Sequence, residues 1–583
     1  MKNMKNNQYC LIGLLLLAST FFACKDNQFE QDGNRQYIAK PELIVTKSGK
    51  NRLQVSFVVP NNQITSAKVF WNNRQNSKDV PLSLATWPST VNTVIGPLEE
   101  GDYTFEVILY NNNGSTSIPV KVTGTALGAK YESTLANRPI KDIFYENNIA
   151  TIYWGDAVAE QQTEVTFTDV NNISRKVIAP FAKDTTQLLN FKPATLSTTI
   201  QYKTAYLPAG SLDTYYANAK TETVITGSLR DLAKAKDVGF GTRLFWGYGG
   251  TNHGIINDPS PNGIYTALAK TEFNVGQAYW GATRWKKEGN SDFNEINACI
   301  NWFKTYQDKA MVTLIVGPNN YMPDWFINGT FTPDEMDLML KNLITEFAQS
   351  NDNKNKVDVM NVANELFNND GTYRDMKWND MGWEPDASGQ TGVNKINLQH
   401  PKFVGKAFQY CRAAFTKALL ELRDYDFEHD VPGTSYYTKH KALYQLLKHM
   451  KAKGYPIDVV GVQAHYTIGD GILGGYEEFK NTIKKFRTAG VEVYLTELDL
   501  VSKKVNSAVQ PWTTTLAEQQ KIDYYNTVKA AIEAGVNVIS LWGLRDDNDP
   551  TWRIGQNPLI IDINYKRKPA YYGVQKALFE AKK

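Results

Sequence analysis

Cysteine is scarce in this chain of 583 residues, which contains only four. Two of them, Cys10 and Cys24, lie in the N-terminal leader, so Cys299 and Cys411 remain for the folded part. Both fall in helical patterns and are expected to be small buried residues. No disulfide framework or metal cluster can be argued from them, and no cofactor motif is visible, so we predict neither a metal nor a cofactor.

An excess of charge of one sign is also absent. Lys and Arg number 63 against 60 Asp and Glu, a net charge of +3. On so long a chain this gives no reason to expect nucleic acid as a partner. The length is too great for one core, so several domains are expected.

A long apolar run is missing, because the run Leu11–Ala18 is too short to span a bilayer. Lys2 and Lys5 precede it and Ala23-Cys24 follows, which is typical of a secretory signal with a bacterial lipobox. We predict a signal peptide over 1–24, lipid attachment at Cys24 and a tether over 25–36. The protein would then be a secreted lipoprotein, anchored to the outer membrane or cell surface of a Gram-negative bacterium. The alternative is an ordinary signal peptide with an incidental cysteine.

Residues 37–228 form a succession of short alternating runs bounded by turns, such as Leu53–Val59 and Tyr103–Tyr110. This spacing predicts two all-β sandwich modules of immunoglobulin or fibronectin type, over 37–136 and 137–228. The first resembles an uncharacterised module found at the start of secreted bacterial lipoproteins. We favour a role as spacer for both modules over the alternative of glycan binding.

Residues 229–583 alternate between strand and helix patterns. Eight strand-then-helix units in about 350 residues favour a (β/α)₈ TIM barrel over a doubly wound sheet. The predicted strands are Phe240–Gly247, Asn274–Trp280, Ala310–Gly317, Val357–Glu365, Leu419–Asp426, Val459–Tyr466, Glu492–Asp499 and Val538–Leu544. Helical segments are predicted between them, for instance Glu295–Lys309, Thr332–Gln349, Phe403–Phe415, Tyr437–Lys453, Tyr476–Ala489, Ala517–Ala534 and Ala570–Lys582.

Two glutamates stand at strand ends of this barrel, Glu365 after the fourth strand and Glu497 in the seventh. Chemistry in such barrels lies at the C-terminal ends of the strands, so both should face one cleft. A protonated acid and a carboxylate flanking one bond are the requirement of glycoside hydrolysis. Either glutamate alone could instead be an ion-paired core residue.

Further polar and aromatic residues should converge on the same face. We expect Gln463 and His465 to share a strand face, with His465 hydrogen-bonding Glu497 and Asp499 orienting the imidazole. Trp542, at the end of the eighth strand, could form an apolar floor for a sugar. His465 and Trp542 each have an alternative as ordinary core residues.

Five motifs in this part of the chain resemble those of glycoside hydrolase family 10, the endo-1,4-β-xylanase family. They are Asn364-Glu365 with Asp370–Arg374 and Trp378; Asp424-Tyr425; Gly461–Tyr466; Thr496–Asp499; and Trp542-Gly543 with Pro558-Leu559 and Lys568–Tyr571. The resemblance implies that Glu365 is the acid/base and Glu497 the nucleophile of a retaining mechanism. It implies that Asn364 and Gln463 contact the sugar 2-hydroxyl, and Tyr466 and Arg284 are further expected sugar contacts.

Three segments depart from the family pattern. Tyr279-Trp280 and the residues after them stand where the family has an acid–amide pair followed by a lysine. Arg284 could supply the cation of that lysine, one residue away from its place. Leu314, Pro318 and Asn319 stand where the family has two histidines and a tryptophan. Arg423 replaces an asparagine before Asp424-Tyr425. The glycone side of the cleft is therefore expected to be rebuilt.

The favoured hypothesis is a membrane-anchored, retaining, endo-acting glycoside hydrolase that cleaves β-1,4-xylan or a related, decorated plant β-glycan. One alternative is a non-catalytic glycan-binding surface lipoprotein. Retention of both glutamates with Gln463 and His465 argues against it, because binding alone requires neither an acid nor a nucleophile. The other alternative is a β-glycanase with a different sugar specificity.

Overall fold

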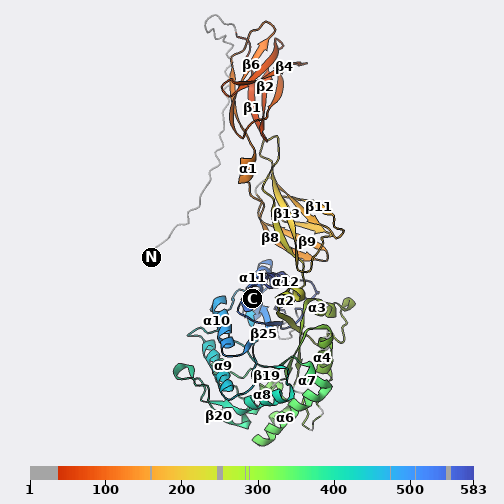
Figure 1. Ribbon diagram of the computed structural model, residues 1–583, viewed down its shortest axis with the longest axis vertical. Helices are drawn as coiled ribbons and strands as arrows, with labels where there is room; N and C mark the ends of the chain where they lie inside the picture. Colours follow the sequence, from red (N-terminus) through yellow and green to blue (C-terminus); the bar gives the residue numbers. More distant parts are fainter. Residues whose placement is uncertain are drawn as a thin grey trace.

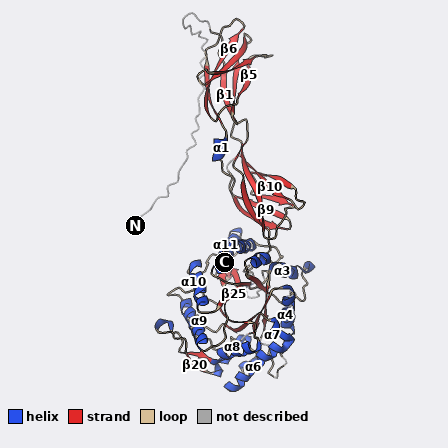
Figure 2. Ribbon diagram, viewed as in Figure 1, coloured by secondary structure: helices blue, strands red, loops and turns tan. Residues whose placement is uncertain are grey.

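The computed structural model describes residues 37–157, 161–245, 254–281, 284–287, 289, 291–314, 316–472, 474–505, 507–546, 553 and 555–583. Cys24, the predicted signal peptide and the predicted tether lie outside the described residues. The chain is elongated, with two sheet-rich modules in line above a larger body of strands ringed by helices (Figures 1 and 2). Within the described residues, no helix has both the length and the hydrophobicity that crossing a membrane requires.

The first module is an antiparallel sandwich, as predicted. Sheet β1-β2-β5 faces sheet β4-β3-β6-β7, and alternate residues of β2, such as Leu53, Val55 and Phe57, are fully buried between them. The strands are β1 (Glu42–Gly49), β2 (Arg52–Val59), β3 (Ile64–Trp71), β4 (Asn76–Pro81), β5 (Ser89–Ile95), β6 (Gly101–Asn111) and β7 (Val120–Ala126).

The second module follows the short helix α1 (Ala129–Thr134) and is also a sandwich. Sheet β12-β9-β8 faces a sheet in which β10 and β13 are central, with Ile152, Trp154 and Phe191 buried between them. The strands are β8 (Ile140–Glu146), β9 (Ile149–Trp154), β10 (Gln161–Thr168), β11 (Ser174–Pro180), β12 (Thr185–Leu189), β13 (Ser197–Tyr206), β14 (Tyr215–Tyr216) and β15 (Lys220–Ile225).

The third part is a closed barrel of eight parallel strands, which confirms the predicted fold class. The strands run β16-β17-β18-β19-β22-β23-β25-β28, and β28 pairs with β16 to close the ring. Their bounds are β16 (Gly239–Arg243), β17 (Val275–Trp280), β18 (Lys309–Leu314), β19 (Val359–Asn364), β22 (Leu419–Asp424), β23 (Val459–Val462), β25 (Glu492–Val501) and β28 (Val538–Leu541). Shorter strands outside the ring are β20 (Trp383–Pro385), β21 (Gln399–Pro401), β24 (His465–Thr467), β26 (Lys504–Val505) and β27 (Ala508–Val509).

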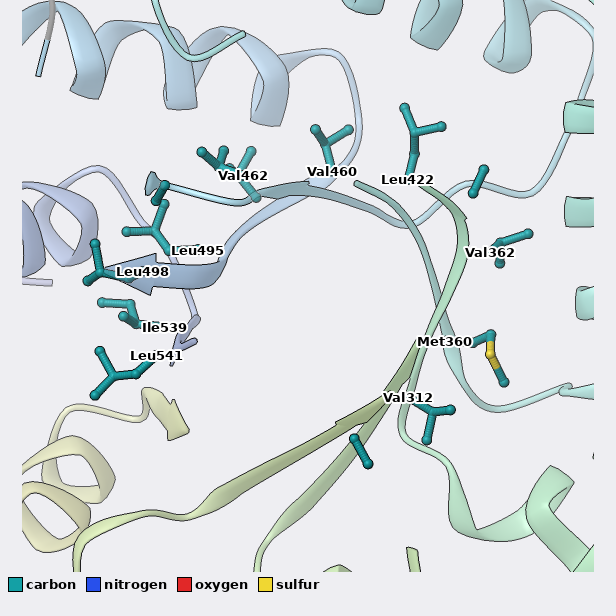
Figure 3. Close-up of a cluster of buried hydrophobic side chains, with 14 of the residues drawn as sticks. Val312, Met360, Val362, Leu422, Val460, Val462, Leu495, Leu498, Ile539 and Leu541 are labelled. Carbon is teal, nitrogen blue, oxygen red and sulfur yellow. The ribbon is translucent and has the colours of Figure 1, made fainter. Parts of the chain in front are cut away.

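Amphipathic helices surround the barrel. The helices are α2 (Leu229–Ala235), α3 (Ile264–Glu272), α4 (Asn294–Tyr306), α5 (Asp324–Ile327), α6 (Pro333–Gln349), α7 (Asn353–Lys356), α8 (Lys402–Ala414), α9 (Ser435–Ala452), α10 (Gly475–Thr488), α11 (Thr514–Glu533) and α12 (Pro569–Glu580). Figure 3 shows the strand side chains that meet them, including Val312, Met360 and Leu422, which point outward from the ring of strands.

The interior of the barrel is layered, because residues two apart on a strand face the same side. The lower layer is apolar and takes one residue from each of several strands: Val275, Met311, Val359, Leu419, Val459, Tyr494 and Val538. Two residues further along these same strands stands a buried polar set: Gln277, Thr313, Asn361, Glu421, Thr496 and Ser540. The barrel interior thus changes from apolar to polar toward the C-terminal ends of the strands, where the site lies.

The sixth predicted strand differs from the structure. It divides into β23 and β24, because Ala464 between them has φ +61°, a left-handed conformation that a continuous strand cannot contain. The eighth strand ends at Leu541, so Trp542 lies just beyond it.

Candidate active site

A cavity of about 950 Å³ opens at the C-terminal ends of the barrel strands. Seven of the residues predicted for the site line it: Arg284, Asn364, Glu365, Gln463, His465, Glu497 and Trp542. They come from segments up to 258 residues apart in the chain, so the barrel topology brings them together. Asp499, the predicted supporting residue, lies behind His465 and is fully buried.

Glu365 is held by three side chains. Gln463 Nε2 donates to its Oε1 at 3.0 Å, Asn364 Nδ2 donates to the same oxygen at 3.2 Å, and Arg374 Nη1 lies 3.5 Å from Oε2. Burial raises the pKa of Glu365, and so do the negative charges of Glu497 and Asp424, although the Gln463 amide and Arg374 oppose them. On balance the pKa of Glu365 lies above that of an ordinary glutamate, so the carboxyl keeps its proton to higher pH.

The backbone at Glu365 is strained. The register of β19 slips between Asn361 and Ala363, and Glu365 itself has φ +51°. A left-handed conformation is uncommon for a residue with a large side chain and costs of order 1–3 kcal/mol. This backbone conformation turns Glu365 away from the strand direction and toward the cavity that it lines.

Glu497 has a different environment. Arg423 Nη1 lies 3.0 Å from its Oε1, and His465 Nε2 lies 3.3 Å from its Oε2. Burial alone would raise the pKa of Glu497, but the hydrogen bonds and charges of His465 and Arg423 outweigh it and the pKa is lowered. Glu497 is therefore the carboxyl that loses its proton more readily, and Glu365 the one that keeps it to higher pH.

The imidazole of His465 is oriented as the sequence predicts. Its Nδ1 lies 3.1 Å from Asp499 Oδ2, opposite the nitrogen that faces Glu497. Burial disfavours the charged ring, yet Asp499 and then Glu497 outweigh it and raise the pKa of His465 to about 10. The ring thus carries a positive charge beside the nucleophile candidate.

The two further predicted sugar contacts on the cavity wall have protein partners. Arg284 forms an ion pair with Glu295, and both line the cavity. The ring of Trp542 is half-buried and carries the Arg243 guanidinium over one face, with 4.3 Å from Cζ to the ring centroid. Trp542 and Arg243 therefore line the cavity together, as an aromatic ring and a cation in contact.

Tyr466 is the exception among the predicted sugar contacts, because it is not among the described residues that line the cavity. Its hydroxyl donates to Glu428 Oε1 at 3.0 Å inside the protein. The prediction for Tyr466 is therefore corrected to a structural contact. Tyr466 was expected at the cavity only as a member of the Gly461–Tyr466 motif, and its side chain is buried.

Of the three segments that depart from the family pattern, only the first is among the described residues that line the cavity. Tyr279 and Trp280 line it, and Trp280 Nε1 donates to Asp292 O at 2.9 Å. Asn319 instead accepts from Lys377 N at 2.6 Å and so holds the loop after β19. For Leu314 only the backbone is described, as the last residue of β18, and Pro318 is buried.

Several cavity residues were missed by the sequence reasoning. Arg243, Tyr321 and Arg553 line the cavity, and so does Asp426, whose pKa burial and Glu428 raise to about 6. Arg243 lies in the predicted first strand, and Asp426 follows the Asp424-Tyr425 motif, so strand-end position was an available signal for both. Nothing in the local pattern marked Tyr321 or Arg553.

Two groups of side chains have the spacing to hold a metal ion, although the sequence predicts no metal. Asp426, Glu428 and His429 offer ligand atoms within 4.8 Å of one another, and so do Asp386, His400 and His449. In the second group, both nitrogens of each ring already have hydrogen-bond partners, so this group is explained by its own network.

A family comparison decides the classification. The model of Glycosyl hydrolase family 10 matches residues 248–577, which is more than half of the chain and holds every residue of the cavity except Arg243, Leu244 and Phe245. The chain belongs to glycosyl hydrolase family 10. It is a glycoside hydrolase, and the resemblance predicted from the motifs is confirmed. A model of a domain of unknown function matches residues 24–215, across both β modules.

Curated relatives of this family 10 chain carry xylanase and glucanase names. "Endo-1,4-beta-xylanase A" of Phanerodontia chrysosporium is 30% identical over 369 residues, 60% of this chain and 76% of that protein. "Exoglucanase XynX" of Acetivibrio thermocellus is 27% identical over 330 residues, 55% of this chain. The chain spans only 27% of that relative's length.

A solved structure shows the same fold. The endo-1,4-β-xylanase XylE of Penicillium canescens superposes with a TM-score of 0.51 at 23% identity, over 61% of this chain and 98% of that one. The superposition thus covers nearly the whole of that xylanase.

Proposed function

We propose that the protein is a retaining, endo-acting hydrolase of β-1,4-xylan or a related plant β-glycan. The observation that carries the proposal is a pair of glutamates in one cavity with opposite surroundings: Glu365 accepts from the Gln463 amide, whereas Glu497 lies against His465 and Arg423. The pKa is accordingly raised for Glu365 and lowered for Glu497. A retaining glycosidase needs this pair, an acid that holds its proton and a carboxylate that has lost it.

In the first step, Glu497 attacks the anomeric carbon. A bond forms between that carbon and a Glu497 oxygen, while the bond from the carbon to the glycosidic oxygen breaks. Glu365 gives its proton to the departing oxygen, so the leaving sugar departs as an alcohol. His465 and Arg423 keep Glu497 ionised until it attacks.

In the second step, water releases the glycosyl enzyme. The water oxygen attacks the anomeric carbon while Glu365, now a carboxylate, takes a proton from that water. The bond between the anomeric carbon and Glu497 breaks. Both residues return to their starting protonation states. Gln463 and Asn364, which contact Glu365, are also suited to hydrogen-bond a sugar hydroxyl beside it.

The sugar preference is proposed from the relatives' names, most of which read endo-1,4-β-xylanase. The exoglucanase name of one relative keeps a β-glucan as the second candidate. Tyr279, Trp280 and Arg284 on the rebuilt wall favour a substrate that differs from plain xylan on the glycone side.

The test is incubation with linear xylan, arabinoxylan, glucuronoxylan, mixed-linkage β-glucan and cellulose, with released oligosaccharides separated by chromatography. We expect oligosaccharides from at least one xylan and an early fall in viscosity, which marks internal cleavage. The Glu365→Ala and Glu497→Ala variants should lose this release, whereas Glu335→Gln, in the capping box of α6, should keep it. Wild-type turnover by both alanine variants would overturn the assignment.

A further inference from the structure

The nucleophile candidate stands in a buried row of alternating charges. Successive groups lie 2.7, 3.0, 3.3, 3.1 and 3.7 Å apart, and the signs cancel over the row. The row runs Glu421, Arg423, Glu497, His465, Asp499 and Arg553. Glu497 therefore has a cation on each side, His465 from β24 and Arg423 from β22.

Arg423 is the less expected of these cations, because the family pattern has a neutral asparagine at its place. Its side chain is fully buried. Nε and Nη2 form a bidentate pair with Glu421 at 2.7 and 3.0 Å, and Nη1 faces Glu497 and Thr313 Oγ1 at 3.0 and 3.2 Å. The Gln277 amide, oriented to suit its neighbours, also accepts from Nη1 at 2.9 Å.

The surroundings are shaped for this arginine. Glu421 stands two residues before it on the same strand and lies on the polar layer of the barrel. A Cβ on Gly461 of the neighbouring strand would approach Glu421 Oε1 to 2.0 Å, so only glycine leaves room for that carboxylate. Two carboxylates on either side of one guanidinium fix its plane, because a bidentate pair restricts both groups.

We propose that Arg423 is a positioning residue, which holds Glu497 in its ionised form and in one orientation, and that Glu421 sets how much of the Arg423 charge Glu497 receives. For catalysis this rests on the proposed function, since it concerns the same nucleophile. The groups that face Glu497 from the surrounding elements are Glu365 from the end of β19, Tyr321, His465 and Arg423.

The kinetic test is the pH dependence of kcat/KM, whose acidic limb reports the pKa of Glu497 in the free enzyme. An opposite charge at this distance moves a carboxyl pKa by about 1–3 units. The double variant Glu421→Gln/Arg423→Gln should therefore move the acidic limb upward by about one pH unit or more. Glu421→Gln alone should move it downward, because Arg423 is then neutralised by Glu497 only.

Two further variants separate positioning from simple loss of structure. Arg423→Lys keeps the charge without the bidentate geometry. Its acidic limb should therefore lie closer to the wild-type position than the acidic limb of the double variant does. Arg412→Gln/Asp458→Asn removes another arginine–carboxylate pair of the barrel, away from the cavity, and should leave the limb unchanged. Shifts of opposite sign in the single and double variants are not expected from destabilisation.

The pKa of Glu497 can also be measured without catalytic turnover. The ¹³C carboxyl signal of Glu497, assigned by its loss in Glu497→Gln, should titrate about one unit higher in the double variant than in the wild type. Equal midpoints and equal acidic limbs in all variants would overturn the proposal. If the wild type cleaves no glycoside, the proposed function fails, while the titration still decides the role of Arg423.

Discussion

At the scale of single residues, the two carboxyl groups differ in their neighbours more than in their burial. Glu365 accepts from neutral amides, with one arginine at 3.5 Å, whereas Glu497 contacts two cations at 3.0 and 3.3 Å. Amide donors stabilise a charge less than ionised donors do. The pKa of the same residue type is therefore shifted in opposite directions within one cavity.

The Glu365→Ala variant tests the acid role. On a glycoside with a poor leaving group its rate should fall by about 10²–10⁴-fold, because the departing oxygen lacks a proton donor. An activated aryl glycoside with a low leaving-group pKa should be cleaved with a much smaller loss in the glycosylation step. Leaving-group series measured for wild type and variant check this. Equal losses across the series would contradict the assignment.

The pH profile tests both carboxyls together. The wild type should show a bell, since activity is lost as pH falls through the lowered pKa of Glu497 and as pH rises through the raised pKa of Glu365. In Glu365→Ala, assayed with an activated aryl glycoside, the basic limb should disappear and the acidic limb should remain. A basic limb that persists unchanged would assign it to another group.

At the scale of secondary structure elements, the barrel itself was predictable and its strand ends were only partly so. Periodicity placed all eight strands, because parallel strands buried on both faces are continuous apolar runs. The ends depend on left-handed residues such as Glu365 and Ala464, which no propensity indicates. Tyr466 was expected at the site from its motif, whereas its neighbour His465 is the residue that lines the cavity.

The missed partners have the same origin. Arg423 reads in the sequence only as a departure from the family, and its contact with Glu497, 74 residues away, arises from barrel closure. Asn364 was predictable as a neighbour of Glu365 because it is adjacent in the chain, and the contact of His465 with Glu497 was predicted from strand-end position, whereas the contact of Gln463 with Glu365 was not predicted. Contacts across the barrel required the structure.

The loop after β19 contains a second buried network. The rings of His400 and His449 lie 4.2 Å apart, and His400 contacts Tyr373 and Asp386 at 2.5 and 2.9 Å. Burial lowers the pKa of His400 to about 4, despite the opposing effect of Asp386. The folded protein therefore keeps His400 neutral at a pH at which the unfolded chain would protonate it.

Acid should loosen this loop. Because the unfolded state binds the proton more readily, stability is lost as pH falls from about 6.5 toward 4. Hydrogen exchange of residues 383–401, corrected for intrinsic rates, should show less protection at pH 5 than at pH 7. The His400→Gln variant, which cannot take up the proton, should show a smaller difference. Equal protection at both pH values in the wild type would contradict the account.

At the scale of the whole molecule, the second sandwich module is joined to the barrel by side chains. Phe144 of β8 stacks on Tyr572 of α12 with 3.9 Å between ring centroids, and Lys521 Nζ of α11 lies 2.6 Å from Asp142 Oδ2. The first module contacts the second through Arg52 and Asp213 at 2.6 Å. These contacts join the modules to each other and to the barrel, while the spacer role of the modules and Cys24 as a lipid anchor stay predictions.

Removing the contact with the barrel should loosen the spacer. Phe144→Ala with Asp142→Ala removes a stacked pair worth about 0.5–1.5 kcal/mol beyond its burial and an ion pair worth about 0–1 kcal/mol. Small-angle scattering should then show a broader distribution of interatomic distances, with activity on soluble oligosaccharides unchanged. Phe181→Ala, an exposed phenylalanine of the same module, should scatter like the wild type. An unchanged profile for the double variant would contradict the account.

The central claim is that Glu365 and Glu497 carry out a double displacement, which retains the configuration at the anomeric carbon. The most direct measurement is a ¹H NMR time course of hydrolysis of a soluble β-linked oligosaccharide by the wild type. The account predicts that the β-anomer of the new reducing end appears first and the α-anomer only later, by mutarotation. Initial appearance of the α-anomer would contradict it.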